Sequence, residues 1–185
     1  MILYIHGFNS SSRSGKAQQL KAWLTERGRQ HEYFCPDLAH RPLNAIRQIE
    51  ALIGGQDAQS VKLIGSSLGG FYATYLVERH GVKAALINPA VHANALLKAA
   101  LGPQNNYSSG EEYVFTPDHL RELDQLDLPR PSRLDNYLLL AEEGDEVLDY
   151  HEAVAYYAGC RQIVHPGGNH GYSRFLDDLP AILSF

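Results

Sequence analysis

Residues 61–73 read Val-Lys-Leu-Ile-Gly-Ser-Ser-Leu-Gly-Gly-Phe-Tyr-Ala, and this stretch decides the fold. Its apolar start, residues 61–64, is typical of a buried strand, and residues 68–77 have the periodicity of a helix. Between them, residues 65–69 match the pattern Gly-x-Ser-x-Gly. A strand, a sharp turn and a helix, in this order, form the setting in which that pattern presents a nucleophilic serine at a sheet edge. The stretch therefore predicts an α/β fold with a serine nucleophile.

The central serine of this pattern is Ser67, which has a glycine two residues away on either side. Ser66 is the alternative, but Gly65 immediately precedes it and puts it out of register. The helix that follows offers backbone N–H groups and a positive dipole end to an anionic intermediate. We assign Ser67 as the candidate nucleophile. The competing interpretation is a Gly/Ser turn that only joins a strand to a helix.

Short apolar runs alternate with longer segments of helical period over the rest of the chain, which is typical of a parallel sheet wrapped by helices. The predicted strands are residues 2–5, 33–35, 61–64, 84–87, 137–141 and 161–164. The predicted helices are residues 17–24, 42–53, 68–77, 151–157 and 175–183. Right-handed crossovers between parallel strands would place these helices on both faces of the sheet.

One segment, residues 91–136, interrupts this alternation. It contains no clear buried strand, several Pro and Gly residues, and one short predicted helix over residues 118–126. A connection of this length inside a domain is usually functional or disordered. We expect one α/β domain over residues 1–185, with residues 91–136 as a small cap-like insertion over the active-site edge. The alternative is that residues 91–136 form an exposed segment without a role at the active site.

A serine hydroxyl becomes an effective nucleophile only beside a base that is itself oriented by an acid. Around a serine turn of this kind, the acid follows a later strand and the histidine follows the last one. His170 lies in a Gly-rich loop after residues 161–164, and Asp145 lies at a turn after residues 137–141. Both loops fall at carboxyl ends of predicted parallel strands, where such sheets assemble their sites. We therefore assign His170 as the base and Asp145 as the acid.

Other residues compete for these two roles. His165 is nearer the strand than His170 and has a structural interpretation. The carboxylates that compete with Asp145 are Glu142, Glu143, Glu146 and Asp149. The first two directly extend the strand, and Asp149 fits the N-cap of the next helix.

The mechanism also needs two backbone donors for the negative charge that develops on the substrate oxygen. The N–H of Leu68, directly after the nucleophile, is the first candidate. The second is the N–H of Phe8, in the loop after the first strand, with Asn9 as the near alternative. We interpret His6 as a residue that fixes this loop through hydrogen bonds. Aromatic residues on a helix or in an insertion more often belong to the core, but they can also line an acyl pocket. The candidates for such a pocket are Phe71, Tyr72, Tyr107, Tyr113 and Phe115.

With these residues in place the chain resembles the α/β-hydrolases, and more narrowly the small bacterial esterase family YqiA. The resemblance covers essentially the whole chain. Besides the serine turn, the motifs that carry it are Tyr-Ile-His-Gly-Phe-Asn-Ser-Ser (4–11), Pro-Asp-Leu (36–38), Leu-Ile-Asn-Pro-Ala (86–90), Gly-Asp-Glu-Val-Leu-Asp (144–149) and Gly-Asn-His (168–170).

This resemblance implies a mainly parallel sheet of six strands in the order 2-1-3-4-5-6, because the chain starts at the third strand of full-length α/β-hydrolases. It also implies a short cap. The implied activity is hydrolysis of carboxylic esters, including acyl thioesters of coenzyme A. The family's triad carries over to Ser67, Asp145 and His170.

Composition argues against several other classes of function. The chain has 185 residues, of which 44% are hydrophobic and 20% charged, as in a soluble globular domain. A net charge of −5 argues against a nucleic-acid surface. No apolar run approaches the roughly 20 residues that span a bilayer, no secretion signal is visible, and the two cysteines suggest no disulfide framework. We expect a cytoplasmic protein that binds neither membrane nor nucleic acid and shows no obligate protein partner.

The sequence thus predicts a serine esterase that acts on a small acyl ester or thioester through an acyl-serine intermediate. This chemistry requires no metal and no organic cofactor. An acyl-CoA thioesterase proper would use the same groups, and a peptidase is a less favoured alternative. The alternative from another class of function is a binding module that has an α/β-hydrolase fold but whose triad catalyses no reaction.

Overall fold

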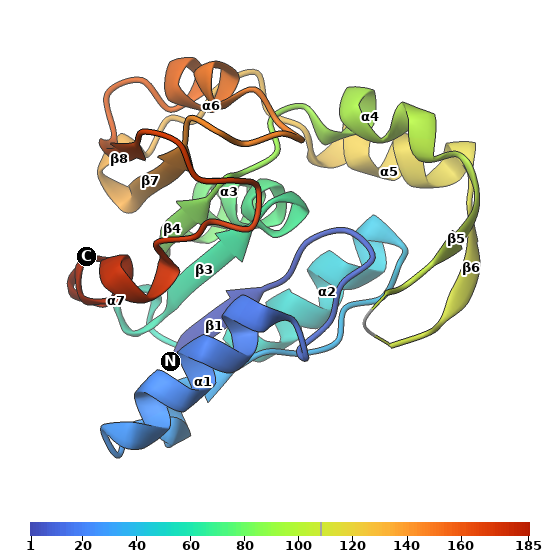
Figure 1. Ribbon diagram of the computed structural model, residues 1–185. Helices are drawn as coiled ribbons and strands as arrows, with labels where there is room; N and C mark the ends of the chain where they lie inside the picture. Colours follow the sequence, from blue (N-terminus) through green and yellow to red (C-terminus); the bar gives the residue numbers. More distant parts are fainter. Residues whose placement is uncertain (108) are drawn as a thin grey trace.

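A parallel sheet forms the centre of the computed structural model, which describes residues 1–107 and 109–185 (Figure 1). Its six strands are β1 (Ile2–Ile5), β2 (Tyr33–Phe34), β3 (Lys62–Ser66), β4 (Lys83–Ile87), β7 (Tyr137–Glu142) and β8 (Arg161–His165). They lie in the order β2-β1-β3-β4-β7-β8, and each neighbouring pair is parallel. Counted within the sheet, this is the expected order 2-1-3-4-5-6. The predicted fold class is confirmed.

Two layers of helices cover the sheet, because alternate side chains of each strand point to opposite faces. On β1, Leu3 and Ile5 join the core that contains α2 and α3, whereas Ile2 and Tyr4 join the core that contains α1 and α7. The helices are α1 (Gly15–Glu26), α2 (Pro42–Ile53), α3 (Leu68–His80), α4 (Ala93–Leu96), α5 (Pro117–Leu126), α6 (Tyr150–Tyr156) and α7 (Phe175–Ser184). Short 3₁₀ turns span Gln30–Glu32, Ala58–Ser60, Leu97–Ala100 and Leu134–Asn136.

The helices form where the apolar period of the sequence places a continuous buried stripe. In α2, Ile46, Ile49 and Ile53 are buried on one face, and Pro42 occupies the first turn, where its missing N–H costs nothing. Each fully buried isoleucine side chain stabilises the fold by about 2 kcal/mol. Such packing keeps the layers fixed, so that the loops at the carboxyl edge of the sheet are held on a rigid base.

The segment predicted as an insertion contains α4, α5 and an antiparallel hairpin of β5 (Gly102–Asn105) and β6 (Glu112–Phe115). Sequence reasoning did not predict the hairpin, since most of its side chains are exposed or half-buried and leave no apolar run. Residue 108, within the predicted insertion, lies outside the described residues. Helix α5 packs against α2, where Arg41 forms an ion pair with Glu122. A cap function for this segment stays a prediction.

The two cysteines, Cys35 and Cys160, are free thiols. In the part of the chain that the structure describes, none of the helices has the length and apolar character needed to traverse a membrane. The carboxyl ends of β1, β3, β7 and β8 carry the loops with the predicted site residues.

Candidate active site

The turn between β3 and α3 holds Ser67 in an unusual backbone conformation, with φ 55° and ψ −121°. A non-glycine residue in such a region carries a strain of about 1–3 kcal/mol, which the surrounding contacts must offset. Tight packing against β1 provides those contacts. A Cβ atom at Gly69 would overlap the carbonyl of Ile5, and one at Gly7 would lie 3.2 Å from the Ser67 Cβ. The glycines therefore let the β1 loop and the serine turn approach each other closely.

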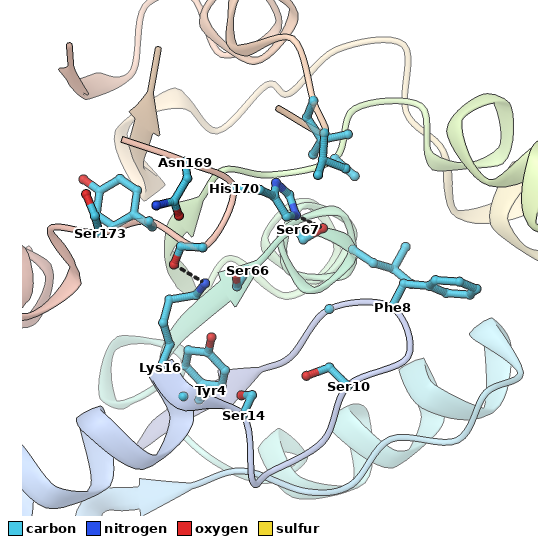
Figure 2. A pocket seen from close by; sticks show the side chains of 18 of the residues that line it. Tyr4, Phe8, Ser10, Ser14, Lys16, Ser66, Ser67, Asn169, His170 and Ser173 are labelled. Carbon is cyan, nitrogen blue, oxygen red and sulfur yellow. Dashed lines mark hydrogen bonds between the residues drawn. The ribbon is translucent and has the colours of Figure 1, made fainter. Parts of the chain in front are cut away.

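His170 bridges Ser67 and Asp145. Its Nε2 lies 3.1 Å from the Ser67 Oγ, and its Nδ1 lies 2.8 Å from one carboxylate oxygen of Asp145 (Figure 2 shows Ser67 and His170). A carboxylate accepts hydrogen bonds, so the proton of the neutral imidazole resides on Nδ1. The Nε2 lone pair then faces the serine hydroxyl. Although Ser67 occupies the N-cap position of α3, its side chain does not cap the helix.

The loop after β7 holds Asp145 firmly. The Asp145 side chain is only 2% exposed, and one of its oxygens accepts hydrogen bonds from the N–H groups of Val147 and Leu148, each at 2.9 Å. The competing carboxylates have other partners. Glu146 accepts from the backbone N–H of His170, and Asp149 caps α6 by accepting from the N–H of His151. Of the carboxylates weighed, the structure brings Asp145 to the His170 ring.

The loop that carries His170 is anchored by Glu142, which sequence reasoning assigned only to a strand end. Its carboxylate is fully buried and accepts four hydrogen bonds from the segment that follows β8. The donors are the N–H groups of Asn169, Ser173 and Arg174 and the Ser173 hydroxyl. Burial alone would raise the pKa of Glu142, but these hydrogen bonds outweigh it and lower the pKa below its ordinary value. A glutamate at the end of an otherwise apolar strand was the signal available in the sequence.

Asn88 is a second anchor that sequence reasoning missed. It follows β4 with a φ of 40°, and its side-chain amide donates to the carbonyls of Asn169 and His170, both at 3.1 Å. Its side-chain oxygen accepts from the N–H of Glu142 at 3.0 Å. Asn88 therefore ties the His170 loop to the end of β7. The sequence motif Leu-Ile-Asn-Pro-Ala contained this residue but did not indicate its role.

On the opposite side of Ser67, the loop after β1 brings Phe8 to the same cavity as Leu68. Leu68 is the first residue of α3, so its N–H has no partner within the helix. His6 fixes this loop as expected, because its Nε2 accepts from the N–H of Leu38 at 3.1 Å and its Nδ1 lies 3.1 Å from the Gly7 carbonyl. Burial lowers the pKa of His6, which favours the neutral ring.

Asn9, the alternative second donor, has its side chain engaged by the hairpin. Its amide donates to Gln104 at 2.8 Å, and its oxygen accepts from the Tyr113 hydroxyl at 2.6 Å. His165 also has a structural partner, Asp178, at 2.8 Å.

Ser67 and His170 line a cavity of about 720 Å³. Phe8, which Figure 2 shows beside Ser67, contributes apolar surface to it, as do Leu97 and Leu148. The aromatic residues proposed from the sequence as an acyl pocket do not line this cavity, and Phe71, Tyr72 and Phe115 are buried in the core. Aromatic side chains on the buried face of α3 pack between the sheet and its neighbours, so the acyl-pocket interpretation was wrong. Among residues 1–107 and 109–185, no group of three or more His, Cys, Asp or Glu side chains is placed to hold a metal ion.

The fold and the serine turn at its sheet edge are those of the α/β-hydrolases. Within that class, the chain belongs to UPF0227, described as an uncharacterised protein family, whose model matches residues 1–185. The YqiA family predicted from the sequence motifs is therefore confirmed.

Several solved structures share this fold. Mouse alpha/beta hydrolase domain-containing protein 10 is 14% identical with a TM-score of 0.74, and the match covers 99% of this chain and 87% of that one. Est1E from Butyrivibrio proteoclasticus is 18% identical with a TM-score of 0.70, and the match covers 100% of this chain and 85% of Est1E. The methylesterase protein MES16 from Arabidopsis is 13% identical with a TM-score of 0.64, and the match covers 100% of this chain and 99% of MES16. At these identities the likeness shows the fold.

Proposed function

We propose that this protein is a serine hydrolase that cleaves carboxylic esters through an acyl-Ser67 intermediate. The observation that carries the proposal is the continuous chain of hydrogen bonds from Asp145 through His170 to Ser67, beside a cavity large enough for a small ester. The name esterase carried by structural neighbours such as the Arabidopsis methylesterase agrees with this choice of chemistry.

In the first half of the reaction, the Ser67 oxygen attacks the ester carbonyl while His170 Nε2 accepts the hydroxyl proton. Asp145 holds the ring in the required orientation and stabilises its positive charge. When the tetrahedral intermediate collapses, the bond to the alcohol oxygen breaks and His170 returns the proton to the departing alcohol. The products of this half are the free alcohol and an acyl-Ser67 ester.

In the second half, water attacks the acyl-Ser67 carbonyl and gives its proton to His170. Collapse of this second intermediate releases the carboxylic acid and restores the Ser67 hydroxyl. Both intermediates carry an oxyanion, for which the N–H groups of Leu68 and Phe8 are the proposed donors. The strained turn favours this role, because Leu68 begins α3 and offers both an N–H and the positive end of the helix dipole.

The decisive test replaces Ser67 with alanine. We expect Ser67→Ala to lower kcat for p-nitrophenyl butyrate roughly 10⁶-fold, because the nucleophile is lost. A fluorophosphonate should label the wild-type protein on Ser67 and leave the folded variant unlabelled. Full activity in Ser67→Ala, or a folded wild-type protein that takes up no label, would contradict the proposal. The second outcome would favour a binding module.

The proposal includes acyl-CoA thioesters as substrates, because a thioester carbonyl accepts the same attack and a thiolate leaves readily. A series of p-nitrophenyl esters and acyl-CoA thioesters of graded acyl length should separate an esterase from a thioesterase. A kcat/KM that is higher for thioesters at every matched length would assign the chain as a thioesterase proper. The proposed partner is in either case a small acyl compound, and the proposed location is the cytoplasm.

A further inference from the structure

The cavity beside Ser67 has two chemically different sides. Phe8 and the leucines of the segment after β4 make one side apolar. The other side contains Ser10, Ser14, Lys16 and Gln19, from the start of α1 and the loop before it. In Figure 2, Lys16 and Phe8 lie on opposite sides of Ser67. An ester bound at Ser67 would therefore have one apolar and one polar neighbour region.

Lys16 carries the positive charge of the polar side. Among the cavity-lining residues that the structure describes, it is the single lysine or arginine. Its ammonium donates one hydrogen bond to the Gly171 carbonyl at 2.7 Å, drawn in Figure 2, and within the described part of the chain it forms no ion pair with a carboxylate. An ammonium has three donors, so two of them stay available for a ligand.

The nearest carboxylates cannot take up these donors. Glu142 and Asp145 act on Lys16 only at longer range, and each already accepts several other hydrogen bonds. Partial burial lowers the pKa of Lys16 to about 8, so the side chain is still mostly protonated at neutral pH. A partly desolvated cation without a counterion is unfavourable, and an anion in the cavity would relieve that cost.

Ser14 supplies a second polar group on the same side. It stands at the N-cap of α1, yet its side chain does not cap the helix. Its hydroxyl oxygen is buried and, apart from an interaction with the Tyr4 side chain, forms no well-directed hydrogen bond with the described residues. A hydroxyl has one donor, and a ligand acceptor in the cavity would engage it better than this contact does. Ser14 and Lys16 thus point to a ligand that is both anionic and able to accept hydrogen bonds.

We propose that the ester substrate carries a carboxylate, and that Lys16 and Ser14 bind this carboxylate at the polar side of the cavity. This inference rests on the proposed ester hydrolysis and narrows its substrate class. A single ammonium matches the single charge of a carboxylate better than the double charge of a phosphate monoester. Lys16 is then a specificity-determining residue: it distinguishes charged from neutral esters of the same length.

The test compares esters that differ only in the charged group. On the acyl side the pair is monoethyl adipate and ethyl hexanoate; on the alcohol side it is ω-acetoxyhexanoate and hexyl acetate. We expect wild-type kcat/KM to favour the carboxylate member of at least one pair about tenfold, the size of one charge-assisted hydrogen bond. Lys16→Met should abolish that preference, and Lys16→Arg should retain most of it.

Lys21→Met is the matched control, because Lys21 is exposed on the same helix and the substitution is identical. It should leave the preference unchanged. If Lys16 only supported the His170 loop through Gly171, Lys16→Met would lower both members of a pair equally. That result, or a wild-type protein without preference in either pair, would overturn the inference. A stronger preference for ω-acetoxypentyl phosphate would overturn the assignment of a carboxylate.

A binding measurement separates this inference from the proposed function. Calorimetric titration of the Ser67→Ala protein with both ester pairs does not depend on turnover. Binding of the carboxylate member of at least one pair about tenfold more tightly, lost in Ser67→Ala/Lys16→Met, supports the carboxylate subsite even if no ester is hydrolysed. Equal binding within both pairs overturns the subsite, whereas the fluorophosphonate labelling of Ser67 still tests the proposed hydrolase activity.

Discussion

Ser67 lies between two loops that the protein holds in place by different means. The His170 loop is fixed from within the sheet, by the buried carboxylate of Glu142 at the end of β7 and by Asn88 after β4. The loop after β1, which contains Phe8, is held by His6 at its start and, from outside the sheet, by the β5–β6 hairpin. Between the residues that the structure describes, the hairpin and its connection contribute four hydrogen bonds to residues 9 and 10.

This difference has an energetic consequence. A buried network on the central strands shares the stability of the core, so disturbing it affects both folding and the position of His170. The hairpin is largely exposed and packs at the edge, so disturbing it should move the β1 loop while the core stays intact. The position of His170 thus depends on the packing of the sheet, and the position of the proposed oxyanion donor Phe8 depends in part on the hairpin of the insertion. Substitutions on the His170 side should change both stability and rate, whereas those on the hairpin side should change mainly the rate.

The largest effect is expected for Asp145→Asn, on the sheet-anchored side. The amide no longer holds the Nδ1–H form of His170, so Nε2 loses its orientation toward Ser67. We expect kcat to fall by about 10⁴, with a smaller loss of stability than for Glu142→Gln, because an amide oxygen still accepts from the N–H groups of Val147 and Leu148. Ester hydrolysis and urea unfolding of the same preparation measure both quantities. A loss of less than tenfold would show that another carboxylate fills this role.

Glu142→Gln should lower both stability and rate, because it leaves the four donors of the His170 loop with a weaker, partly mismatched acceptor. We expect a loss of about 2–4 kcal/mol in the free energy of unfolding at pH 7. Glu143→Gln, the same change at the next residue on an exposed side chain, is the control.

The pH dependence of this difference follows from the lowered pKa of Glu142. The ionised carboxylate stabilises the folded state at pH values above its ordinary pKa of 4.5, and that contribution disappears as the pH falls through the lower folded-state value. The stability gap between wild type and Glu142→Gln should therefore narrow in acid. Urea midpoints measured from neutral to acidic pH give this gap, and a gap that widens in acid would contradict the assignment.

The smallest effect is expected on the hairpin side, for Tyr113→Phe. This change removes the hydroxyl that donates to Asn9, next to the proposed oxyanion donor Phe8. Losing one hydrogen bond of about 1 kcal/mol should lower kcat about fivefold and leave the unfolding midpoint nearly unchanged. Tyr107→Phe is the control, since the Tyr107 side chain is 87% exposed in the connection between the two strands of the hairpin. If Tyr113→Phe instead reduced stability as much as Glu142→Gln, the contrast between the two loops would be wrong.

Sequence reasoning recovered most of the sheet and helices because their signals are local. The strand at residues 61–64 and the α2 helix each show in a short window of apolar spacing, and both lie close to the predicted residues. Of the three residues assigned as nucleophile, base and acid, His170 lies within hydrogen-bonding distance of both Ser67 and Asp145. Their catalytic roles, the cytoplasmic location and the lack of an obligate partner stay predictions. The hairpin was missed because its exposed strands have no apolar pattern.

The order of strands and helices and the turn that exposes Ser67 follow from the sequence, because apolar periodicity and glycine spacing act over a few residues. The contacts that hold the site together, and the residues that surround it, follow from the packing of the folded chain. Asn88 meets the His170 carbonyl across 82 residues of chain, and Lys16 meets the Gly171 carbonyl across 155. A polar side chain in a loop has no periodic signature, so its partner is set by the packing of layers that are distant in sequence.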